Sequence, residues 1–108
     1  MFKYKQMIKD IQAAEAKAYL ALKQYEHDNM PLDNFGDCQR WRMTNTTYIV
    51  LQSKWAGIDS IMNMLSIKVD ATHPNRRLAA ALCLKTALNR LSKYPKINPI
   101  KFEEITKE

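Results

Sequence analysis

The stretch WRMTNTTYIVLQSKWAGIDSIMNML, residues 41–65, decides the fold that the sequence predicts. Its mainly apolar positions recur at spacings of three and four: Trp41, Thr44, Tyr48, Leu51, Trp55, Ile58, Met62 and Leu65. This spacing is typical of a helix that packs along other helices at small crossing angles. The β-branched residues of TNTTYIVL favour a strand instead. Because the periodicity continues through them, we predict one helix over about 38–67.

The segment before this stretch has the same pattern. Apolar side chains recur every three or four residues from Tyr4 to Tyr25, and the alanine-rich centre AAEAKAYLAL has a high helix propensity. We predict a helix over about 2–27. The following EHDNMPLDNFGD is rich in residues that favour turns. Asp37 is expected to cap the second helix, with Asp33 as the alternative.

A third helix is predicted over about 74–94, because Pro74 suits a first helical turn, where its missing N–H needs no partner. Leu84, Leu88 and Leu91 are expected to form the main apolar ridge that packs inward, with Leu78 and Leu82 on an adjoining ridge. Asn98 followed by Pro99 and IKFEEI combines a cap, a preset turn and acidic residues near a helix start. This combination predicts a short helix over about 99–106.

These patterns together predict an all-α fold: one domain over 1–108, an antiparallel bundle of three long helices with the short fourth packed on it. A chain of 108 residues that is 46% hydrophobic suits a single compact domain. Its apolar runs are far shorter than the roughly 18 residues that span a bilayer, so we expect no membrane span. We expect no membrane-surface role either, because each amphipathic helix needs its apolar face for the bundle. The two cysteines, Cys38 and Cys83, favour free thiols, and the start of the chain lacks the apolar run of a secretory signal. We therefore expect a cytoplasmic protein.

No arrangement of residues in the sequence is typical of catalysis. Histidine occurs only at His27 and His73, and Gly-x-Ser-x-Gly, HExxH and a phosphate-binding glycine loop are absent. We therefore predict no catalytic residues and no cofactor. A metal site would have to combine both histidines with Cys38 and Cys83, whose spacings are unsuitable, so we also predict no metal site. Carboxylates such as that of Glu15 are expected to be solvated.

The charge is distributed unevenly along the chain. Lys and Arg total 17 against 11 Asp and Glu, a net charge of +6. Residues 68–101 hold eight basic and one acidic side chain (+7), residues 1–67 hold eight and seven (+1), and residues 102–108 hold one and three (−2). A local excess of this kind favours anionic partners.

The up-down-up order gathers basic residues at one end of the bundle. The predicted partner- or anion-binding residues there are Lys3, Lys5, Lys9, Lys68, Arg76 and Arg77. Helix starts carry partial positive charge, so the arginines of HPNRR are unfavourable unless an anion binds beside them. The alternative is that Arg76 and Arg77 pair with Asp70 or with solvent.

The opposite end carries a second basic surface whose charges are nearly balanced by acidic neighbours. Its predicted members are Arg40, Arg42, Arg90, Lys93 and Lys96. Surface ion pairs contribute about 0–1 kcal/mol each and indicate little about function. Trp41, which lies between two of these arginines, is expected to pack inward at the end of the bundle.

These features predict a small non-enzymatic regulatory or inhibitor-type protein that binds a larger protein with an acidic surface. The alternative is binding to the phosphate backbone of nucleic acid without sequence readout. The connection before Pro74 is too long for a helix-turn-helix, and Arg76, Arg90 and Lys93 point away from the leucine ridge. Monomer and dimer stay open, because the same apolar stripe would serve either.

Overall fold

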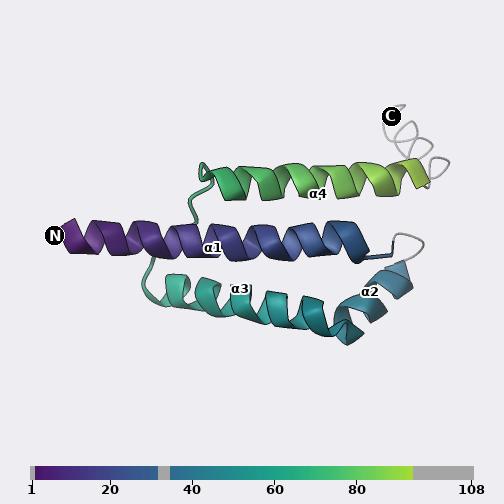
Figure 1. Cartoon of the computed structure of the whole chain (residues 1–108), viewed down its shortest axis with the longest axis horizontal. Coiled ribbons are helices and arrows are strands. Elements are labelled where there is room, and N and C mark those ends of the chain that lie inside the picture. The colour runs from purple at the N-terminus through teal and green to yellow at the C-terminus, as the bar shows by residue number, and fades with distance from the viewer. Residues whose placement is uncertain (1, 32–34, 94–108) are drawn as a thin grey trace, which may run out of the picture.

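The computed structural model describes residues 2–31 and 35–93, and the side chains of residues 4–31 and 36–91. Its elements are α1 (Phe2–Asn29), α2 (Phe35–Thr44), α3 (Thr46–Met64) and α4 (Pro74–Lys93) (Figure 1). The part of the chain that is described contains helices and no strand, which confirms the predicted all-α fold. The predicted helix over 99–106 lies outside the described residues.

The central helix of the fold is α1, with α3 along one side of it and α4 along the other (Figure 1). After α1, the chain returns along it as α3 and then runs in the direction of α1 again as α4. Both flanking helices pack on α1 rather than on each other. Side chains of α1 therefore form most of the contacts that hold the fold together.

The predicted helix over 38–67 is two helices, which corrects the sequence prediction. The chain breaks at Asn45, whose extended backbone (φ −76°, ψ 111°) makes it the N-cap of α3. The Asn45 side-chain oxygen accepts a hydrogen bond from the Tyr48 backbone N–H at 2.9 Å, and the Thr44 hydroxyl donates to the Arg40 carbonyl. These polar side chains satisfy backbone groups locally and so compete with a continuous helix.

Helix α3 ends in a Schellman motif, a compact turn that satisfies its last carbonyl groups. The backbone N–H of Ile67 donates to the Met62 carbonyl at 2.8 Å, and that of Ser66 donates to the Asn63 carbonyl at 3.2 Å. Ser66 adopts the left-handed conformation that this turn requires, with φ 57°. The turn directs the chain into the connection that leads to α4.

Trp41 packs inward, in an aromatic cluster that joins the break between α2 and α3 to α1. Its ring stacks on that of Tyr25, with centroids 5.8 Å apart, and lies 5.1 Å from the ring of Tyr48. The Tyr25 hydroxyl also donates to the Asn45 side chain at 3.0 Å. The cluster keeps α2 and α3 in contact with α1 although the helix is interrupted.

Candidate functional site

The predicted basic end is more extended in space than the sequence suggested. Lys5, Lys9, Lys68 and Arg77 are exposed, and the side chain of Lys3 lies outside the described residues. The start of α4 lies beside the middle of α1, because Arg76 bonds Glu15. At a rise of about 1.5 Å per residue, Lys5 is roughly 15 Å from that point along α1. These cations therefore form a dispersed basic surface rather than a compact pocket.

Arg76 is withdrawn from this surface by a partner within the chain. Its Nε donates to Glu15 Oε1 at 3.0 Å, its Nη2 donates to Oε2, and its guanidinium lies 3.7 Å from the centroid of the Tyr19 ring. Trp55 Nε1 donates to the same carboxylate at 2.7 Å. The anion expected beside the arginines of this helix start is thus Glu15. The side chain of Glu15 is fully buried, so the prediction that its carboxylate is solvated was wrong.

The environment of this ion pair favours the charged form of Arg76. Burial by itself lowers the pKa of Arg76, but the hydrogen bonds and negative charge of Glu15 outweigh it and raise the pKa above its ordinary value. For the neighbouring Tyr19 hydroxyl, burial has the opposite effect and raises the pKa, and the proximity of Cys83 raises it further. Arg76 is therefore a permanently charged structural residue whose hydrogen bonds are directed inward.

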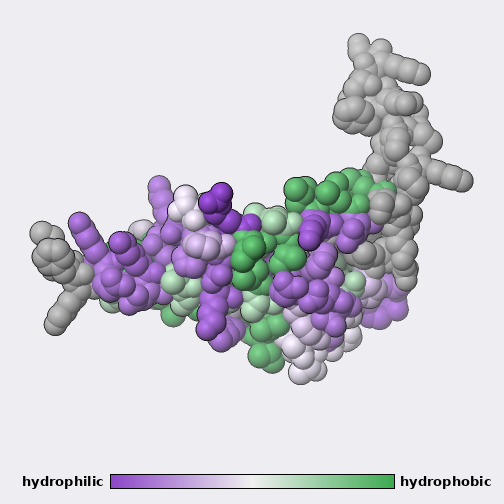
Figure 2. Space-filling model, turned by 45° about the horizontal axis from the view of Figure 1, so that its top comes forward, coloured by the Kyte–Doolittle hydropathy of each residue, from purple (hydrophilic) through white to green (hydrophobic). Residues whose placement is uncertain are grey.

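Helix α4 leaves four of its five leucines exposed, which corrects the prediction that its leucines pack inward; only Leu82 is partly buried, on the same side as the fully buried Ala79. The side that faces α1 carries polar contacts, such as Arg76 with Glu15 and Thr86 with His27 at 2.9 Å. The opposite side carries Leu84, Leu88 and Leu91, which are 61%, 53% and 46% exposed, and Leu78, 56% exposed, lies at its flank; these four residues are called the leucine face. Figure 2 shows hydrophobic side chains gathered at the surface over α4.

Basic residues border the leucine face. Arg77 and Lys85 are exposed and, at about 100° per residue, lie on the same side of α4 as the leucines. Neither has an ion-pair partner among the residues that the structure describes. Contiguous apolar surface with a polar rim is typical of protein–protein interaction sites. The leucine face is therefore a candidate for a partner-binding surface.

The second predicted basic surface is divided between solvent and the interior. Arg40 is exposed and lies 3.7 Å from Asp37. Arg42 and Arg90 are only partly exposed and line a cavity instead. The side chain of Lys93 and the whole of Lys96 lie outside the described residues.

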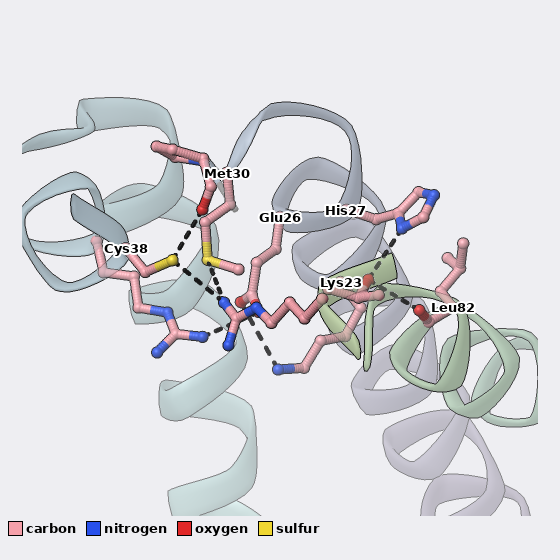
Figure 3. A network of polar contacts seen from close by, with 10 residues as sticks. Lys23, Glu26, His27, Met30, Cys38 and Leu82 are labelled. Carbon is pink, nitrogen blue, oxygen red and sulfur yellow. Dashed lines mark hydrogen bonds and ion pairs between the residues drawn. The ribbon is translucent and has the colours of Figure 1, made fainter. Parts of the chain in front are cut away.

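The cavity has a volume of about 210 Å³ and lies between α1, α2 and α4. Its lining residues are Lys23, Glu26, Met30, Arg42, Cys83, Thr86, Ala87 and Arg90, and Figure 3 shows several of them converging. Glu26 is buried, accepts a hydrogen bond from Arg42 Nη2 at 3.2 Å and lies 3.7 Å from Lys23 Nζ. Arg90 directs its Nη2 at two sulfur atoms, Cys38 Sγ at 3.3 Å and Met30 Sδ at 3.6 Å.

Over residues 2–31 and 35–93, no group of three or more His, Cys, Asp or Glu side chains is arranged to hold a metal ion. Neither Cys38, which is buried, nor Cys83, which is exposed, forms a disulfide. In the same part of the chain, no helix has the length and apolar character needed to cross a membrane. Comparison with protein families, curated proteins and solved structures finds no match for this chain.

The two buried acids are the important residues that the sequence reasoning missed. Glu15 and Glu26 are eleven residues apart, which is about three helical turns, so they lie on the same side of α1. Leu22, a buried apolar residue, lies on that side as well. A signal was available, because acids at this spacing within an apolar stripe indicate buried ion pairs with basic residues from other helices.

Proposed function

We propose that this chain is a small non-enzymatic regulatory or inhibitor-type protein that binds a larger protein through the leucine face of α4. The observation that carries the proposal is the orientation of α4: the side with Arg76, Ala79 and Thr86 packs on α1, while four of the five leucines remain exposed. A soluble helix normally buries its apolar side. A partner that covers the leucine face would bury the apolar side of α4.

The apolar area that the leucine face exposes is enough for only a modest binding affinity. Fully burying a leucine contributes about 1.5–3 kcal/mol. The four leucines are already about half buried, so covering the rest contributes roughly 3–6 kcal/mol in total. Association costs at least about 4 kcal/mol in lost translational and rotational freedom. A stable complex therefore needs further contacts, and the cations beside the leucines are available for them.

The charge of the rim defines the partner. Arg77 and Lys85 would meet carboxylates, so the matching surface is an apolar groove bordered by Asp and Glu. This agrees with the basic excess of residues 68–101. Complementary charges at the rim would mainly accelerate association and select the partner.

The proposal is tested by capture of partners on three immobilised proteins: wild type, Leu84→Ser with Leu88→Ser, and a control with Val50→Ser and Ile61→Ser. The control pair changes exposed apolar residues of α3 rather than α4. We expect the same protein on wild type and control, its loss on the α4 variant, and no effect of nuclease treatment. Equal retention by all three would contradict the proposal.

Self-association is checked first, by light scattering on the purified wild type and the α4 variant. We expect a monomer in both cases. A wild-type dimer that becomes monomeric in the α4 variant would show that a second copy of the chain covers the leucine face, and would overturn the proposal of a larger partner.

Nucleic-acid binding is the alternative, and it rests on the exposed cations Lys5, Lys9, Lys68 and Arg77. It predicts binding to duplex or single-stranded DNA or RNA that weakens steeply with salt and in the variant Lys68→Glu with Arg77→Glu. Arg76 is excluded from that design because its charge is paired inside the fold. Absent or salt-independent binding would rule this alternative out.

A further inference from the structure

The cavity between α1, α2 and α4 has an unbalanced charge. Three of its lining residues are basic (Lys23, Arg42 and Arg90) and one is acidic (Glu26), so their formal charges sum to +2. Glu26 is shared between two of the cations, Arg42 at 3.2 Å and Lys23 at 3.7 Å. The excess positive charge is therefore associated mainly with Arg90.

Polar atoms without hydrogen-bond partners are concentrated in the same wall. Within the described part of the chain, the buried side-chain atoms that lack a hydrogen-bond partner are Arg42 Nε, Arg90 Nε and Glu26 Oε2, the last of which lies 3.7 Å from Lys23 Nζ as an ion pair. All three belong to residues that line this cavity. Buried polar groups in folded proteins are normally hydrogen-bonded, so the two Nε–H donors indicate a ligand that accepts hydrogen bonds, and the acceptor Glu26 Oε2 needs a donor such as water.

Arg90 differs from the other partly buried arginines in its acceptors. Arg76 and Arg42 each donate to a carboxylate, Glu15 and Glu26 respectively. Arg90 donates to the sulfur atoms of Cys38 and Met30, which are weak acceptors. Among the residues that the structure describes, no carboxylate forms an ion pair with Arg90. A partly buried guanidinium without a counter-charge is unfavourable, because its charge has lost much of its hydration.

We propose that this cavity binds a phosphate-type oxyanion through Arg90, Arg42 and Lys23. The planar fork of an arginine matches the oxygens of a phosphate group, and a lysine supplies a compact point charge. The volume of about 210 Å³ is several times the roughly 30 Å³ that a water molecule occupies, so a small oxyanion fits with some water. The ligand is inorganic phosphate or the phosphate group of a monoester. This site is independent of the leucine face.

The test is isothermal titration of the full chain with inorganic phosphate and with phenyl phosphate, at constant ionic strength in a buffer free of other oxyanions. The proteins are wild type, Arg90→Gln and the matched control Arg40→Gln, which removes an exposed arginine of α2. We expect binding to weaken about tenfold or more in Arg90→Gln and to stay unchanged in Arg40→Gln. Tighter binding of inorganic phosphate would identify the free ion as the ligand, and tighter binding of phenyl phosphate would identify a monoester. No binding at millimolar concentration, or equal affinity in wild type and Arg90→Gln, would overturn the proposal.

A second measurement does not depend on the variant being folded. In wild-type protein, the arginine Nε–H signals of Arg90 and Arg42 should move during a phosphate titration followed by nuclear magnetic resonance, while that of Arg40 stays in place. Movement of the Arg40 signal alone, or no movement of any, would show that phosphate does not enter the cavity.

Discussion

The carboxylate of Glu15 on α1 accepts two hydrogen bonds from the guanidinium of Arg76 on α4, with Arg76 Nε 3.0 Å from Oε1. The same carboxylate accepts from Trp55 of α3 at 2.7 Å. One buried side chain thus connects the central helix to both of its neighbours. Since α3 and α4 pack on α1 rather than on each other, this connection is important for their placement.

Replacing Glu15 by leucine should destabilise the protein by roughly 3 kcal/mol. This is the lower part of the range for breaking a buried ion pair, because the Arg76 side chain keeps 19% of its surface exposed. The loss arises from a partly buried cation left without its carboxylate. Urea unfolding followed by circular dichroism measures the change.

The double variant Glu15→Leu with Arg76→Met serves as the control for that prediction. Removing both charges should recover most of the lost stability, because apolar residues often replace a buried ion pair without a net loss. Trp55 Nε1 would still lack its acceptor, so a deficit of about 1 kcal/mol should remain. A double variant no more stable than Glu15→Leu would contradict the electrostatic explanation.

Asn45→Ala should cost about 1 kcal/mol. The substitution removes the N-cap of α3 and the acceptor of the Tyr25 hydroxyl. Asn45→Asp, which keeps an acceptor oxygen at the same position, should retain most of the stability. Thermal unfolding of the three proteins compares them, and an unchanged midpoint for Asn45→Ala would show that this cap does not stabilise the start of α3.

Ser66→Gly should stabilise the protein by about 0.5–1 kcal/mol. Ser66 has a φ of 57°, and glycine adopts this left-handed conformation without the steric cost that a side chain incurs. Ser60→Gly is the matched control, because Ser60 is exposed within α3, where glycine should destabilise by a few tenths of a kcal/mol. Opposite signs for the two substitutions in urea unfolding are the expected result, and a loss of stability in both would contradict it.

The protein should lose stability at alkaline pH, in part through Tyr48. Burial raises the pKa of this hydroxyl, and the negative charge of Glu26 adds to the increase. Because the folded-state pKa lies above the unfolded value of about 10, the contribution is complete below pH 10 and is lost as pH rises through the folded pKa. Urea midpoints measured from pH 8 to 11 should fall less in Tyr48→Phe than in wild type. Equal pH dependence in both proteins would exclude this role for Tyr48.

The sequence by itself determined the fold class and the approximate helix limits. Predicted helices over 2–27 and 74–94 correspond to Phe2–Asn29 and Pro74–Lys93, because helical periodicity and turn residues are local properties of the chain. The break at Asn45 was missed since the apolar spacing continues across it. The local polar motif TNTT was the better signal, because its side chains bond nearby backbone groups.

Tertiary structure alone decided which side of α4 packs and which charges remain available. The apolar pattern predicted that the leucines of this helix contact α1, but the side that carries Arg76, Ala79 and Leu82 does so instead. The buried carboxylate of Glu15 favours the side of α4 that carries Arg76, because burying that charge without Arg76 would cost far more than leaving half-exposed leucines in water. The same partnership removes Arg76 from the predicted binding residues, whereas Arg90 lines the cavity and has no carboxylate partner within residues 2–31 and 35–93. These choices depend on residues that meet only when distant helices come together.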